Sequence, residues 1–146
     1  MSIESVNPAI GRVFLSYARE DVDTATRLFN GLRKSGVDVW LDREVLLPGQ
    51  NWKAVIRQAI IESRFFLALL SNNSVSKKGY VQKELKHALE ILDEYPETAI
   101  FIIPVRLDDC NPTGKELQDL HWIDIFNDWD QGLEKIIKTI HSQSNT

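Results

Sequence analysis

Short apolar runs alternate with amphipathic stretches along the chain, and this alternation predicts the order of its secondary-structure elements. Apolar runs rich in β-branched and aromatic residues predict strands at residues 12–17, 37–41, 64–70, 98–105 and 122–126. Apolar residues at helical spacing predict helices at residues 22–32, 52–62, 80–92 and 129–140. Strands that alternate with helices at these lengths predict an α/β fold, with a parallel sheet and helices on both faces.

The loops that follow the predicted strands are where we expect a functional site. In parallel α/β sheets, ligands bind outside the carboxyl ends of the strands. The loops concerned are residues 18–21, 42–51, 71–79 and 107–114. Residues 1–11 are expected to form a leader with little structure, residues 12–142 one domain, and residues 143–146 a tail.

Glu84 fits the pattern of its predicted helix poorly. At about 100° per residue, its side chain falls between Ala88 and Ile91, roughly 80° from the centre of the apolar arc. Its carboxylate is therefore expected along the flank of a buried face, and burying a charge is costly unless a partner meets it. Two interpretations stay open: a carboxylate near a helix N-terminus that is paired with a nearby lysine, or a carboxylate at the edge of a cleft that meets a substrate.

The composition is that of a globular domain, with 43% apolar and 26% charged residues in a chain of 146. A net charge of −4 and a pI near 5.4 argue against binding to nucleic acid or to an anionic membrane. The sequence contains no apolar run of the roughly 18 residues that span a membrane, and its first residues do not resemble a signal peptide. We therefore expect a cytoplasmic location.

Cys110 is the only cysteine of the chain, so it cannot form an internal disulfide. Without a cluster of histidines and cysteines, no metal site is expected. The neighbouring carboxylates of Asp108 and Asp109 would raise the pKa of its thiol, which predicts a neutral thiol in a loop or in a semi-buried position.

Familiar catalytic motifs are absent from the sequence. It contains neither a Gly-x-Gly-x-x-Gly turn nor a P-loop, and no Gly-x-Ser-x-Gly elbow. An acidic cluster of the phosphoacceptor kind could be drawn from Glu20, Asp21 and Asp42, but Leu70 and Ser71 stand where the third strand would have to supply an aspartate.

Four short motifs stand at the ends of the predicted elements. They are Val-Phe-Leu-Ser-Tyr at residues 13–17, Val-Trp-Leu-Asp at 39–42, Leu-Pro-Gly-Gln-Asn-Trp at 47–52, and the stretch 71–84 with an aromatic residue four positions before its final glutamate. In this order they resemble the motifs of a Toll/interleukin-receptor homology (TIR) domain, over residues 12 to about 141. The resemblance implies a flavodoxin-like three-layer sandwich with a five-stranded parallel sheet.

The TIR family includes non-enzymatic adaptors and enzymes that cleave the nicotinamide–ribose bond of NAD+. The resemblance implies that Glu84 is catalytic and that Tyr80 is the aromatic surface beside the substrate, where a tryptophan is common. It also implies that Tyr17 and Arg19 border the nicotinamide end. The implied substrate is NAD+, with NADP+ left open, and no separate cofactor is implied. Ala18 departs from the pattern, since some catalytic members have a basic residue there.

A single carboxylate suits this chemistry. Ordinary glycosides need a second carboxyl group that protonates the departing oxygen. Nicotinamide carries the positive charge of a pyridinium and leaves as a neutral molecule, so the enzyme has only to hold the ribose and stabilise an oxocarbenium-like centre. Capture by water yields ADP-ribose, and capture by another nucleophile of the same molecule yields a cyclic isomer.

The loop at residues 42–51 is expected to serve both the site and self-association. The resemblance implies that Asp42 contacts the substrate at the end of the second strand. Pro48 and Gly49 set a turn, and the apolar residues before it, Leu46 and Leu47 among them, suggest docking onto a neighbouring copy.

Many enzymes of this family are active only when copies stack head to tail, a contact that forms open filaments. Resemblance to prokaryotic members implies a role in antiphage defence. The main alternative is a non-enzymatic TIR module that acts by homotypic binding, as an adaptor or as an effector. A third reading is that these residues are the terminal domain of a longer chain.

Overall fold

The computed structural model describes residues 12–40, 48–76, 80–96, 99–112 and 115–143. The predicted leader, the predicted tail from residue 144 and residues 41–47 lie outside the described residues. The described strands are β1 (Arg12–Ser16), β2 (Asp38–Trp40), β3 (Phe65–Leu70), β4 (Ile102–Arg106) and β5 (Ile123–Asp124). They form one sheet in the order β2-β1-β3-β4-β5, and every pairing is parallel.

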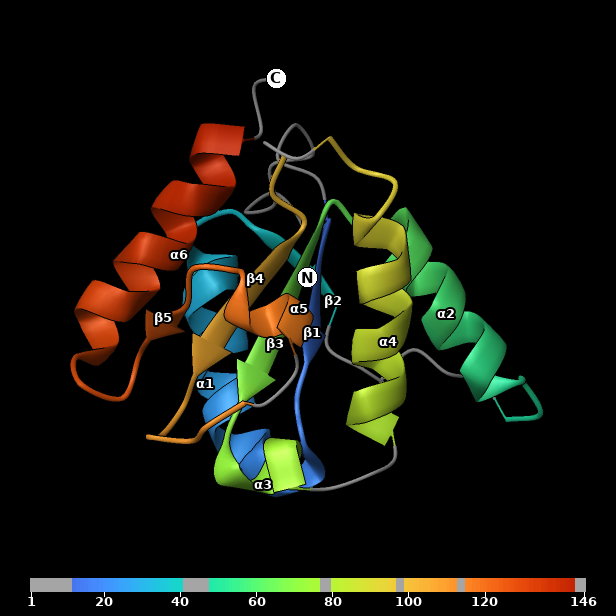
Figure 1. The fold of residues 1–146 in the computed structure, drawn as a ribbon, viewed down its shortest axis with the longest axis horizontal. Helices are drawn as coiled ribbons and strands as arrows, with labels where there is room; N and C mark the ends of the chain where they lie inside the picture. Colours follow the sequence, from blue (N-terminus) through green and yellow to red (C-terminus); the bar gives the residue numbers. More distant parts are fainter. Residues whose placement is uncertain (1–11, 41–47, 77–79, 97–98, 113–114, 144–146) are drawn as a thin grey trace.

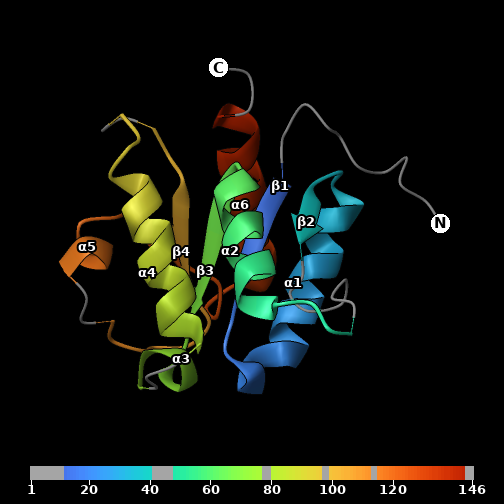
Figure 2. The ribbon, with the colours of Figure 1, turned by 90° about the vertical axis from the view of Figure 1, so that its right-hand side faces the viewer.

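Helices cover both faces of the sheet, which gives the flavodoxin-like three-layer sandwich (Figures 1 and 2). On one face α1 (Val22–Lys34) packs against α6 (Trp129–Gln143), and on the other α2 (Trp52–Glu62) packs against α4 (Tyr80–Leu92). The shorter helices are η1 (Arg19–Asp21), α3 (Asn72–Ser76) and α5 (Lys115–Gln118). Figure 1 shows α3 at the carboxyl ends of the central strands.

The two faces of the sheet have separate apolar cores. Val13 and Leu15 of β1 belong to the cluster beneath α1 and α6, which we call the α1/α6 core. Phe14 points to the opposite face and belongs to the cluster beneath α2 and α4, the α2/α4 core. The unbroken apolar run at residues 64–70 is typical of a central strand that is covered on both faces, and every residue of β3 is buried.

Local signals in the sequence place two helix boundaries. Gly36 has a φ of 84°, and its N–H and that of Val37 donate to the carbonyls of Arg33 and Leu32, so α1 ends in a Schellman motif. The side chain of Asn51 caps α2, since its Oδ1 accepts a hydrogen bond from the N–H of Ala54 at 3.3 Å.

Two strands are three residues shorter than predicted. The fourth was expected at residues 98–105 but begins at Ile102, which pairs with Phe66 of β3. The fifth was expected at residues 122–126 but is confined to Ile123–Asp124, because it pairs only with Val105 and Arg106. The length of a strand depends on where a neighbour offers hydrogen bonds, and apolar composition does not report that.

Three short helices were missed, among them η1, which lies in residues 18–21 that were predicted to be a loop. Residues 71–79 were predicted to be a loop, yet residues 72–76 form α3, and α5 lies in the stretch that was expected to be irregular. Helices of four or five residues are too short to show a helical period. The readable signal for α3 was Ser71, whose Oγ accepts a hydrogen bond from the N–H of Ser74 at 3.1 Å in the manner of an N-cap.

Candidate active site

The candidate site lies where the sheet changes its direction of winding. β1 and β3 are neighbours in the sheet, but the long helices that follow them cover opposite faces. α1, which follows β1, covers one face, and α4, which follows β3, covers the other. In doubly wound sheets, the crevice outside the carboxyl ends of such strands binds ligands. Ser16 ends β1 and Ser71 follows β3, and both side chains are buried.

Glu84 lies in the second turn of α4 and is joined to the end of β1. Its side chain is 3% exposed, and its Oε1 accepts a hydrogen bond from Oγ of Ser16 at 2.6 Å. The sequence had predicted a carboxylate on the flank of the buried face, but α4 packs against β1 and covers that flank. A short hydrogen bond to a charged acceptor is among the stronger polar contacts in proteins.

A second carboxylate ties the loop after β1 to α3. Asp21 accepts hydrogen bonds from Oγ of Ser71 at 2.5 Å and from Nδ2 of Asn73 at 3.1 Å. The N–H of Ser71 in turn donates to Oγ of Ser74 at 2.8 Å. These bonds hold α3 against the loop that follows β1.

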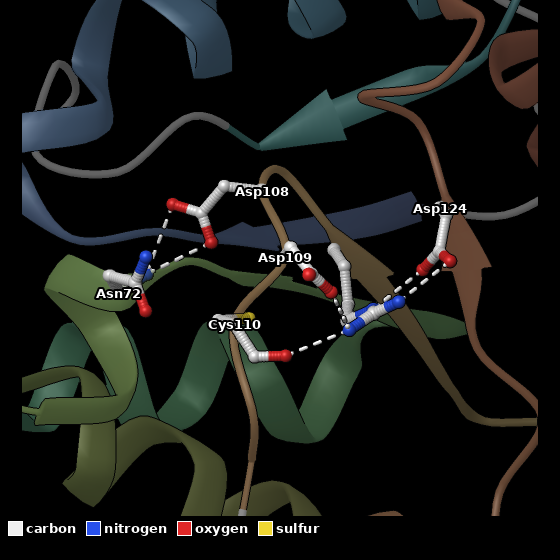
Figure 3. Close-up of polar contacts among 6 residues, drawn as sticks. Asn72, Asp108, Asp109, Cys110 and Asp124 are labelled. Atoms are coloured by element: carbon white, nitrogen blue, oxygen red, sulfur yellow. Dashed lines mark hydrogen bonds and ion pairs between the residues drawn. The ribbon is translucent and has the colours of Figure 1, made fainter.

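Hydrogen bonds join the loop after β4 to α3 on one side and to the end of β4 on the other, and Figure 3 shows these contacts. Arg106 donates to both carboxylate oxygens of Asp124, at 2.6 and 2.8 Å, and to the carbonyl of Cys110 at 2.8 Å. The carboxylate of Asp108 accepts from the backbone N–H of Asn72, at 3.1 Å for each oxygen. The hydrogen bond with Arg106 holds the pKa of Asp124 below its ordinary value and raises the pKa of Arg106.

Cys110 lies within this loop and has the character that the sequence predicted. Its side chain is buried, and burial, followed by the charge of Asp108, raises the pKa of the thiol to about 11. The predicted rise in the pKa of the thiol is confirmed in direction, although burial is its main cause.

The structure does not bring all the predicted substrate contacts together. Tyr17 is half-buried and packs against the α1/α6 core, across the sheet from the face that carries Glu84. Arg19 is exposed in η1. Tyr80 is the first residue of α4, and its side chain lies outside the described part of the structure. The roles of these residues in substrate binding stay predictions.

Most of the predicted assembly loop cannot be placed. Asp42, Leu46 and Leu47 lie outside the described residues. Pro48 and Gly49 are exposed and form a turn, as predicted, in which Gly49 has a φ of 87°. A positive φ is the conformation that the third residue of a type II turn requires.

Sequence reasoning assigned no role to Ser16, Ser71 or Asp21 in the site. The signal for the two serines was a hydroxyl at the end of a run of apolar strand residues, where burial is expected and a polar side chain needs a partner. For Asp21 no signal was available, because its partners follow it by some fifty positions in the chain.

A separate cavity of about 760 Å³ runs along the β4 edge and α6, and its lining includes Ile102, Trp122 and Lys135. Ser16, Ser71 and Glu84 do not line it. We place the candidate site at the carboxyl edge because the buried hydroxyl and carboxylate meet there. Among the described residues, no group of His, Cys, Asp or Glu could hold a metal ion, and no described helix is long and apolar enough to cross a membrane.

Comparison with known proteins gives consistent matches. A family model described as TIR domain matches residues 13–137. The chain is 38% identical to the NAD(+) hydrolase PdTIR of Paracoccus denitrificans over 74 residues, 50% of this chain and 24% of that protein. It is 34% identical to the NAD(+) hydrolase TcpC of Escherichia coli O6:H1 over 73 residues, 49% of this chain and 24% of that protein.

Solved structures show the same fold. The TIR domains of the activated Roq1 resistosome match with a TM-score of 0.72 at 22% identity, over 89% of this chain and 99% of that chain. The curated relatives are longer proteins, since the chain spans only 17 to 24% of their length.

Proposed function

This chain belongs to the TIR domain family, and from that premise we propose that it hydrolyses NAD+ at the nicotinamide–ribose bond, with Glu84 as the catalytic residue. The observation that carries the proposal is the buried carboxylate of Glu84, hydrogen-bonded to Ser16 at the carboxyl edge of the sheet. The similarity to two proteins named as NAD(+) hydrolases supports it.

In the proposed reaction the bond between the ribose C1′ and the nicotinamide nitrogen breaks, and its electron pair leaves with nicotinamide. The carboxylate of Glu84 stabilises the positive charge that develops on the ribose, and a surrounding of low polarity strengthens that interaction. Water adds to C1′ and loses a proton, which gives ADP-ribose. Attack by a nucleophile of the same molecule would give a cyclic isomer instead.

The burial of Glu84 also supports a need for self-association. A carboxylate that is 3% exposed has little access to a substrate in the isolated chain. Stacked copies that rearrange the crevice would give the substrate access, with the loop that contains Leu46, Leu47, Pro48 and Gly49 as the docking element. The proposal requires that activity per molecule rises with protein concentration. An activity per molecule that stays flat over a wide dilution series would contradict it.

A non-enzymatic scaffold that acts by homotypic TIR binding is the second candidate. The observation in its favour is that a serine hydroxyl satisfies the buried carboxylate of Glu84, as a purely structural glutamate would require.

Chromatography of NAD+ and its products decides between the two candidates. Wild type and Glu84→Gln are compared at low and at high concentration with a crowding agent, and Glu90→Gln, an exposed position on the same helix, is the matched control. We expect wild type and the control to release nicotinamide and Glu84→Gln to be at least about a hundredfold slower. If wild type releases none at any concentration, the scaffold interpretation replaces the enzyme.

Depletion of NAD+ in infected cells would provide antiphage defence, the biological role that we propose for this activity. Plaque counts on cells that express wild type or Glu84→Gln test this role. Equal plaque counts for the two would exclude it.

A further inference from the structure

Ser16 occupies a position where a hydroxyl needs an explanation. It ends a strand whose preceding three residues are apolar and buried, and its own side chain is 2% exposed. Alanine would fill such a position without a polar atom. A hydroxyl removed from water costs free energy unless a partner satisfies it, and the partner here is Oε1 of Glu84 at 2.6 Å.

The O–H of Ser16 is the donor of this hydrogen bond, and Oε1 of Glu84 is the acceptor. This direction suits an ionised carboxylate, the form that the proposed reaction uses, because such a group has acceptor sites only. The donor therefore fixes the place of one oxygen of the carboxylate relative to β1.

β1 is a rigid place from which to hold that oxygen. The strand lies between β2 and β3, and Ser16 pairs in register with Ala68 of the buried central strand. Glu84 reaches the same point from α4 through a side chain with three rotatable bonds. The hydrogen bond from Ser16 narrows the choice among the rotamers of this side chain, each of which would place the carboxylate differently.

We infer that Ser16 is a positioning residue for the proposed reaction, whose hydroxyl holds the carboxylate of Glu84 in the orientation that meets the ribose. The inference rests on the proposed function. It goes beyond it because it assigns a catalytic consequence to a residue that does not touch the substrate. A hydrogen bond to a charged group is worth enough that its loss lowers a rate about ten- to a hundredfold.

The test measures kcat and KM for nicotinamide release from NAD+ with a set of buried serine variants, at a concentration where wild type is active. Ser16→Ala removes the donor, Ser16→Cys replaces it by a weak donor of similar size, and Ser16→Thr restores it. Ser63→Ala is the matched control, because Ser63 is also buried but precedes β3, at the opposite end of the sheet, and donates to the carbonyl of Ala59 in the preceding helix α2. Thermal melting followed by circular dichroism gives the folded fraction of each variant, and each activity is expressed per folded molecule.

We expect Ser16→Ala and Ser16→Cys to lower kcat about ten- to a hundredfold with KM changed less than about threefold. Ser16→Thr should recover kcat to within about threefold of wild type, and Ser63→Ala should match wild type.

Three results would overturn the inference while the proposed function stands. The first is a normal kcat in folded Ser16→Ala. The second is an increased kcat in Ser16→Ala, which would show that the hydrogen bond restrains Glu84. The third is a folded Ser16→Thr that is as impaired as Ser16→Ala, which would show a packing role. If wild type itself releases no nicotinamide, the proposed function fails, and the positioning role fails with it.

Discussion

Gly132 in α6 offers a sharp test of how tightly this helix packs on the sheet. A Cβ added at this buried position would stand 2.8 Å from Cγ1 and 3.0 Å from Cα of Ile125, the residue that follows β5. Cα is a backbone atom and cannot rotate away, so Gly132→Ala requires α6 or the end of β5 to move.

The magnitude is the difference between two opposing effects. Alanine stabilises a helix interior by about 1 kcal/mol relative to glycine, whereas overpacking a dense core costs typically about 1–3 kcal/mol. Because one close contact of Gly132→Ala is with backbone, we expect a net destabilisation of about 1–2 kcal/mol. In a domain of this size that lowers the melting temperature by roughly 3–6 °C.

Gly31→Ala in α1 is the matched control. Its added Cβ would meet Cδ2 of Leu133 at 2.9 Å, but that atom is the tip of a side chain, and the next contacts, at 3.5 Å and beyond, belong to the same side chain. Leu133 can adjust its rotamer, so Gly31→Ala should leave stability within about 0.5 kcal/mol of wild type or raise it.

Urea and thermal unfolding followed by circular dichroism measure both changes. The packing argument is wrong if Gly132→Ala is as stable as wild type, or if Gly31→Ala loses as much stability as Gly132→Ala.

Three further predictions concern the polar contacts at the carboxyl edge. The pKa of Asp124 is held low by Arg106, so the contribution of this carboxylate to stability is present above about pH 4 and is lost as pH falls further. When the pH is lowered from 5 to 2, the unfolding free energy measured in urea should therefore fall by about 1 kcal/mol less in Asp124→Asn than in wild type. An equal fall in both proteins would contradict this. Because the pKa of Cys110 is raised to about 11, iodoacetamide should label it at pH 8 at least about a hundredfold more slowly in native than in urea-unfolded protein; comparable rates would refute its burial. Asp21→Ala removes the acceptor of the Ser71 hydroxyl and should cost about 1–2 kcal/mol of unfolding free energy; a loss no larger than that of Asp23→Ala, an exposed position, would argue against this contact.

The periodicity of the sequence was sufficient for the order of the strands and the long helices along the chain. The run of apolar residues that forms β3 predicted a central strand, and all six of its residues are buried. Gly36 and Asn51 stand at a helix end and a helix start in the structure, where these residue types have local backbone or capping roles. Local signals of this kind need no knowledge of the rest of the fold.

The candidate site was only partly predictable. Glu84 was identified because a carboxylate is unexpected beside the apolar face of its own helix. The sequence of that one helix is enough to reveal it. Its partner Ser16 lies 68 positions earlier in the chain and was missed as a site residue. Tyr17, its neighbour in the same motif, packs against the opposite core, because successive residues of an extended chain point to opposite faces of the sheet.

The sequence by itself determined the fold class, the order of the strands and the long helices along the chain, the family and the candidate glutamate, since hydrophobic periodicity and short motifs act over neighbouring residues. The tertiary structure alone decided how long β4 and β5 are, that α3 is held by Asp21 and Asp108, and that a serine hydroxyl meets the carboxylate of Glu84. These features depend on hydrogen bonds between groups that are distant in the chain. Such groups become neighbours only when the parallel sheet brings the carboxyl ends of its strands to one edge.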